Sequence, residues 1–211
     1  MNTYLMHMGI PASRTRLPSE TRQTEIIEAV LDLAAQGSPA DITTADIADR
    51  LKLSQGAIFK HFSSKSAIWL AVLDWVQSRL FARLDAAAQR ADTPLEGLEA
   101  MFMAHVKFIA AYPGVPRLIF QHLSQSRDTP LKSGMRNMLA RYRKLLTEIL
   151  GEAERQGQIP AGQDKAAAAM LFIGAIQGLA IQSMLNGGSS KMQDEAKRVL
   201  KLYLRSIEAK S

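Results

Sequence analysis

No charged side chain occurs in the twenty residues from Ala166 to Leu185, "AAAAMLFIGAIQGLAIQSML". A helix of this length can cross a bilayer, and Gly174 and Gly178 have the spacing at which helix backbones approach closely. Two glutamines, a serine and an alanine run count against a membrane helix, as does the lack of flanking aromatic belts. We therefore expect a helix buried on nearly all sides, packed on its own core by one face and on a second copy of the chain by another.

Two helices from each copy are expected to form a four-helix bundle. The second of them covers about residues 190–208, where apolar residues recur at helical spacing. The expected dimer contacts are these small, apolar or aromatic residues of the two segments: Gly174, Gly178, Ile181, Leu185, Val199 and Tyr203.

The remaining chain also shows helical periodicity, and no stretch has the sustained alternation of a strand. Thr43 and Thr93 each have an acidic residue at the capping-box position, and Pro94 suits the first position of a helix. We predict an all-α fold with about nine helices, at about residues 20–36, 44–51, 54–61, 64–90, 94–111, 115–124, 129–157, 163–186 and 190–208.

The segment "TTADIADRLKLSQGAIFKHFSSK", residues 43–65, has the layout of a helix-turn-helix. In such a motif the second helix enters the major groove and presents its first residues to base edges. Gln55 can reach those edges, Gly56 lets the backbone come close, and Ala57 can touch a thymine methyl. Five further residues are placed for phosphate contacts, namely Thr43, Thr44, Lys60, His61 and Lys65. The alternative is a helical pair inside an ordinary bundle, with Lys60 and Lys65 as solvated charges.

The charge distribution agrees with an anionic partner only locally. The chain has a net charge of +6, but residues 1–80 hold eight basic and eight acidic side chains. Between Arg50 and Ser66 there are four basic residues and no acidic one. We predict three units: a flexible basic arm (1–19), a three-helix helix-turn-helix DNA-binding domain (20–66), and a larger helical regulatory and dimerisation domain (67–211). The arm is either a disordered tail or a segment that tracks DNA.

The run from Ser54 to Phe62, followed by Lys65 and an apolar helix, resembles the N-terminal module of the TetR/AcrR family of bacterial transcriptional regulators. That resemblance implies a homodimer that binds a palindromic double-stranded DNA operator, usually as a repressor, and is released by a small molecule. The chain departs from the family pattern at three positions. Phe59 stands where a tyrosine is frequent and would contact phosphate, Lys52 where a glycine is frequent, and Ser66 where an acidic residue is frequent.

The larger domain offers residues for an apolar pocket with a few polar anchors, the usual form of a small-molecule site. The candidate lining residues are Trp75, Met101, His105, Phe108, Phe120, Met138, Tyr142 and Gln177, although an apolar residue of this domain is more often ordinary core than pocket lining. His105 and Gln177 are the candidate anchors. With no cysteine and no carboxylate cluster near His105 and His122, we expect no metal site.

Neither a nucleophile with its base nor a cofactor motif is visible, so the sequence indicates a regulator and not an enzyme. We expect a cytoplasmic, ligand-responsive DNA-binding repressor with a lipophilic effector and no membrane partner. Two alternatives stay open: a DNA-binding protein without an inducer, and an all-helical small-molecule-binding protein with a vestigial DNA module.

Overall fold

The computed structural model describes residues 19–124, 127–186 and 191–208. Within these ranges the chain forms nine α-helices and no strand, which confirms the predicted all-α fold. The predicted arm lies almost wholly outside the described residues. The helices are α1 (Ser19–Gln36), α2 (Thr44–Arg50), α3 (Gln55–Phe59), α4 (Lys65–Ala88), α5 (Pro94–Ala111), α6 (Gly114–Leu123), α7 (Pro130–Arg155), α8 (Lys165–Leu185) and α9 (Met192–Ile207).

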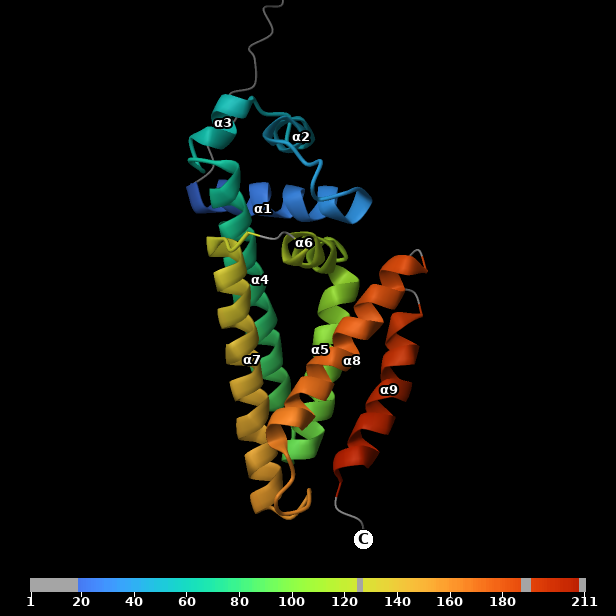
Figure 1. The fold of residues 1–211 in the computed structure, drawn as a ribbon. Coiled ribbons are helices and arrows are strands. Elements are labelled where there is room, and N and C mark those ends of the chain that lie inside the picture. The colour runs from blue at the N-terminus through green and yellow to red at the C-terminus, as the bar shows by residue number, and fades with distance from the viewer. Residues whose placement is uncertain (1–18, 125–126, 187–190, 209–211) are drawn as a thin grey trace, which may run out of the picture.

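Helices α1 to α3 form a small unit at one end of the molecule (Figure 1). Its core consists of side chains with no exposed surface from all three helices and from the start of α4, namely Ile26, Val30, Ile47, Ile58 and Ile68. The predicted capping box starts α2, because the Asp46 amide donates to Thr43 Oγ1 (3.1 Å) and the Thr43 amide donates to Asp46 Oδ2 (2.7 Å).

The turn between α2 and α3 contains Lys52, the one described residue other than glycine with a positive φ, 55°. The turn is closed by the Leu53 amide, which donates to the Ala48 carbonyl (2.8 Å). A left-handed conformation costs a residue with a side chain about 1–2 kcal/mol. The lysine therefore adopts the backbone geometry that a glycine, frequent at this position in the family, would adopt without strain.

Helix α4 runs from the small unit far into the larger one and lies beside α7 (Figure 1). The boundary predicted at residues 66 and 67 falls inside the first turn of α4, so the exact division of the chain stays a prediction. The larger unit packs α4, α5, α7, α8 and α9 around fully buried aromatic rings. Phe102 of α5 and Phe172 of α8, for example, meet edge to face with their ring centroids 5.1 Å apart.

Helix α6 crosses at the junction, directly against α1 (Figure 1). Gly114, the first residue of α6, is buried on the backbone of α1: a Cβ atom at this position would lie 2.1 Å from the carbonyl oxygen of Leu31. Only glycine permits this approach, because any side chain would collide with main-chain atoms. The small unit thus rests on α6 as well as on α4.

Candidate DNA interface and ligand cavity

Helix α3 is short and presents a small, open face. The Ser54 side chain caps it by accepting from the Ala57 amide (3.3 Å). Gln55 and Gly56 are exposed. A Cβ atom at Gly56 would meet only Ser54 Oγ, at 3.9 Å, so packing within the chain does not require a glycine there. A backbone that must come close to an outside surface would require it.

The Phe59 side chain points away from the core, unlike those of Ile58 and Phe62. Ile58 is fully buried and Phe62 is 7% exposed, so these two fasten α3 to the core. The Phe59 ring, in contrast, is 48% exposed beside the exposed Lys60. The ring is therefore accessible from outside the chain, and its assignment to the DNA interface stays a prediction.

Other predicted phosphate contacts already have partners inside the chain. The Thr43 hydroxyl donates to Asp46 Oδ2 (2.7 Å), and this bond is the main cause that lowers the pKa of Asp46. The Lys65 ammonium lies 5.6 Å from the centroid of the Trp69 ring. The assignment of Thr43, Thr44, Lys60, His61 and Lys65 to phosphates stays a prediction.

The sequence reasoning missed two α1 residues that hold the end of α3. Ser19 Oγ lies 3.3 Å from His61 Nδ1, and Gln23 Nε2 donates to the His61 carbonyl (3.3 Å). These residues are about 40 positions apart in the sequence and come together only in the fold, so no local pattern predicts the contact. His61, which follows α3, is held on α1 through one ring nitrogen and its backbone carbonyl.

The larger unit contains a cavity of about 350 Å³, partly open to solvent, with walls from α4, α5, α6, α7 and α8. Six of the eight predicted lining residues belong to its walls, namely His105, Phe108, Phe120, Met138, Tyr142 and Gln177. The walls are mainly apolar, and α6 contributes Val115, Ile119 and Leu123. This volume lies in the range of small-molecule pockets.

The prediction was wrong for Trp75 and Met101, which do not line this cavity. The next residue, Val76, lines the cavity instead. One step along a helix turns the side chain by about 100°. Trp75 is therefore directed elsewhere, with its ring edge to face on Tyr112 at a centroid distance of 5.1 Å. Met101 has no exposed surface and belongs to the packed core.

The polar pair in the cavity wall is electrically neutral near pH 7. His105 Nδ1 lies 3.2 Å from the Tyr142 hydroxyl. The His105 ring keeps some surface open to the cavity, but the surrounding protein atoms remove it from bulk water and lower its pKa to about 4. Burial raises the pKa of Tyr142 in the same way. The pair can offer hydrogen bonds but no charge.

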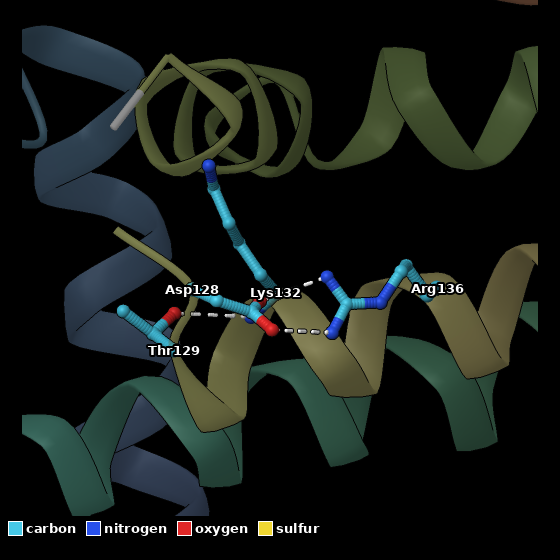
Figure 2. A network of polar contacts seen from close by, with 4 residues as sticks. All are labelled: Asp128, Thr129, Lys132 and Arg136. Carbon is cyan, nitrogen blue, oxygen red and sulfur yellow. Dashed lines mark hydrogen bonds and ion pairs between the residues drawn. The ribbon is translucent and has the colours of Figure 1, made fainter. Parts of the chain in front are cut away.

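Two cations that the sequence analysis did not select, Lys132 and Arg136, lie on the cavity wall near the start of α7. Figure 2 shows Arg136 paired with Asp128 and Lys132 reaching toward α6. Arg136 Nη1 and Nη2 donate to the two carboxylate oxygens of Asp128 (2.8 and 3.0 Å). Thr129 caps the helix by accepting from the Lys132 amide (3.2 Å).

Helix α8 carries an uncovered apolar face. Met170, Leu171, Ile181 and Leu185 are between 41% and 80% exposed, and Leu202 of α9 is 67% exposed. Around Gly174 and Gly178 no described atom beyond the local helix lies within 4 Å of an added Cβ atom. The helix is long and apolar enough to cross a membrane, and 39% of its most apolar 18-residue stretch is buried within the chain. One such helix is weak evidence for a membrane protein.

One predicted dimer contact was wrong. Tyr203 is only 3% exposed and lies edge to face on Phe172, with the ring centroids 5.5 Å apart. It shares a face of α9 with the buried Leu200 and Ile207, whereas the outward residue is Leu202. The other predicted contacts are exposed or partly exposed and stay predictions.

The chain matches known families at both ends. Residues 26–72 match the family model of bacterial regulatory proteins of the tetR family, and residues 94–208 match that of the C-terminal part of BetI-type transcriptional repressors. Among curated proteins, the nucleoid occlusion factor SlmA of Marinomonas sp. is 25% identical over 141 residues, which are 66% of this chain and 72% of that protein.

Solved structures share the fold at low identity. FadR of Bacillus subtilis, a transcriptional regulator in complex with stearoyl-CoA, has a TM-score of 0.77 and 21% identity over 88% of this chain and 99% of its own. The ketosteroid transcriptional regulator KstR2 of Mycobacterium tuberculosis has a TM-score of 0.75 and 21% identity, over 90% of this chain and 96% of its own. These similar proteins are transcriptional regulators and not enzymes.

Proposed function

The chain belongs to the tetR family of bacterial regulatory proteins, and we propose that it is a cytoplasmic, ligand-responsive repressor of transcription. In this proposal a homodimer binds a palindromic operator through α3. It leaves the operator when a small lipophilic effector enters the cavity between α4 and α8. The names of two structural neighbours, a stearoyl-CoA complex and a ketosteroid regulator, agree with an effector of this kind.

One observation carries the proposal: α6 is at once a wall of the cavity and a support of the DNA-binding unit. Val115 faces the cavity, while the preceding Gly114 lies on the α1 backbone at Leu31. A ligand that moves α6 must therefore also move α1 or break this contact. Ligand affinity that differs between two positions of α6 would shift the population of the DNA-binding form.

In this proposal the two copies of the chain meet through the apolar face of α8. Exposed apolar surface of this extent is uncommon on a monomer and marks an interface. Gly174 and Gly178 leave room for a facing helix. A twofold axis at α8 and α9 would present both α3 helices to one side of a duplex, about 34–36 Å apart in the DNA-binding state.

The proposal is tested by fluorescence anisotropy with labelled duplex from the protein's own promoter region, at low salt and without ligand. We expect specific binding whose affinity falls steeply as salt is raised. Lys60→Ala should weaken binding to all sequences, whereas Gln55→Ala should weaken the preference for the operator. Failure to bind the promoter region under these conditions would contradict the proposal.

A second candidate is a DNA-binding protein that acts without a small-molecule inducer. It is favoured by the SlmA relatives, whose printed name, nucleoid occlusion factor, mentions no ligand. The cavity of about 350 Å³ favours the first candidate, because a DNA-binding protein without an effector has no need of one. A search for compounds that raise the melting temperature and release the DNA separates the two.

A further inference from the structure

The cavity has a cationic end and a neutral end. Lys132 and Arg136 are one turn apart at the start of α7, and Tyr142 lies farther along the same helix. At a rise of about 1.5 Å per residue, the ten residues from Lys132 to Tyr142 span about 15 Å. Between them α7 presents Met135, Met138 and Leu139 to the cavity. A molecule lying along α7 would thus meet charge first, then apolar side chains, then the His105–Tyr142 pair.

No described residue that lines this cavity is acidic. The nearby carboxylate of Asp128 is held by Arg136 through two hydrogen bonds. The opposite end carries no charge of its own near neutral pH, because burial keeps His105 unprotonated and Tyr142 protonated, so this end offers hydrogen bonds and no counter-ion. A cationic effector would find no counter-ion in these walls, whereas an anionic one would find two candidates at a single end.

From this arrangement we infer that the effector is an amphipathic anion, with its acidic group at Lys132 and Arg136 and its apolar body along α7 toward His105 and Tyr142. This inference rests on the proposed function, because it names the chemical class of that effector. Two sources share this chemistry: an acyl chain with a free carboxylate, and an acyl chain joined to a phosphate-bearing carrier such as coenzyme A.

The ion pair with Asp128 does not prevent such binding. The Arg136 and Asp128 side chains are 58% and 70% exposed, and exposed ion pairs contribute little to stability. A guanidinium binds carboxylate or phosphate through two parallel hydrogen bonds. A ligand anion can therefore replace Asp128 as the partner of Arg136, and Asp128 competes with it.

The test uses the full-length protein without DNA and isothermal titration calorimetry with decanoate, decan-1-ol and decyltrimethylammonium, each below its micelle concentration, and with decanoyl-coenzyme A. We expect one or both anions to bind at least tenfold tighter than the alcohol and the cation. Which anion binds tighter identifies the source. Equal binding of anion and alcohol, tighter binding of the cation, or no binding of either anion would overturn the inference.

Three variants assign the preference to the cationic end. Arg136→Gln should reduce the tenfold preference for anions to threefold or less and leave decan-1-ol binding unchanged. Asp128→Asn should strengthen anion binding, because it releases Arg136. Arg143→Gln is the matched control, an exposed arginine of α7 outside the cavity, and should change nothing. Equal losses for alcohol and anion in Arg136→Gln would show a merely structural role and refute the assignment.

Failure of this inference is distinguishable from failure of the proposed function. If the anion binds preferentially but operator-bound protein keeps its DNA, the proposed release mechanism is wrong and the ligand class stands. If a cation or a neutral alcohol releases the DNA at lower concentration than either anion, the ligand class is wrong and the release mechanism stands.

Discussion

The main chain of Gly114 lies against the main chain of Leu31, so closely that a methyl group at position 114 would be 2.1 Å from the Leu31 carbonyl oxygen. This contact joins the helix that lines the cavity to the first helix of the DNA-binding unit. The contact is stiff because the atoms that meet in it belong to the two main chains, and these cannot swing aside as the end of a side chain can. If the contact persists, displacement of α6 has to move α1 with it.

Gly114→Ala should separate the two units. The methyl group must push α6 from α1, and overpacking of this kind costs about 1–3 kcal/mol. We expect lower stability in denaturant unfolding and weaker operator binding, with dimerisation retained in sedimentation velocity. The control is Gly151→Ala, since no described atom lies within 4 Å of a Cβ there and alanine favours the helix by about 1 kcal/mol. Normal operator affinity in Gly114→Ala would mean that α6 does not position α1.

Phe59→Tyr tests the exposed aromatic ring on α3. Because the ring is 48% exposed, a hydroxyl at its end can reach a DNA phosphate without disturbing the core. One added hydrogen bond contributes about 0.5–1.5 kcal/mol, so anisotropy should show roughly twofold to thirteenfold tighter binding. Phosphate contacts carry no sequence information, so operator preference should not change. Phe59→Leu serves as the control without a hydroxyl, and tighter binding in both variants would rule out the phosphate contact.

The sequence predicted the helices and the recognition motif because their signals are local. Thr43 and Thr93 cap their helices through residues only three positions away, and Lys52 takes the positive φ that the turn demands. Apolar residues on a helix are harder to place, since one step turns the side chain by about 100°. Tyr203 was assigned to the wrong face, and Trp75 faces away from the cavity that Val76 lines.

The sequence analysis did not predict the charged end of the cavity. Lys132 and Arg136 look like ordinary solvated charges on an amphipathic helix. Their place on the cavity wall depends on the packing of α6 and α8 beside α7, and no local sequence pattern predicts such a tertiary contact. A stripe of cations, methionines and a tyrosine on one face of α7 was the only available hint.

The apolar face of α8 should hold the dimer together. Leu185 is 80% exposed, so Leu185→Asp hardly disturbs the monomer but places a charge in an apolar interface. We expect sedimentation velocity to show monomers and operator binding to weaken at least tenfold. Tyr203→Phe should leave the dimer intact and raise stability by about 1 kcal/mol, because its buried hydroxyl has no hydrogen-bond partner among the described residues. If the Leu185→Asp variant still sediments as a dimer, the dimer interface does not include this end of α8.

Burial of His105 should make the stability of the protein depend on pH between about 7 and 5. The pKa of its imidazole is about 4 in the folded protein and 6.5 without the environment of the fold. As pH falls below 6.5, His105 takes up a proton in the unfolded chain but stays unprotonated in the folded one, so the free energy of unfolding decreases. Linkage gives a loss of about 2 kcal/mol between pH 7.5 and pH 5. The His105→Gln variant cannot titrate at this position, so its chemical denaturation curves should depend less on pH by that amount. Parallel pH profiles for the two proteins would show that His105 is solvated in the native state and that the neutral end of the cavity, at His105 and Tyr142, is open to water.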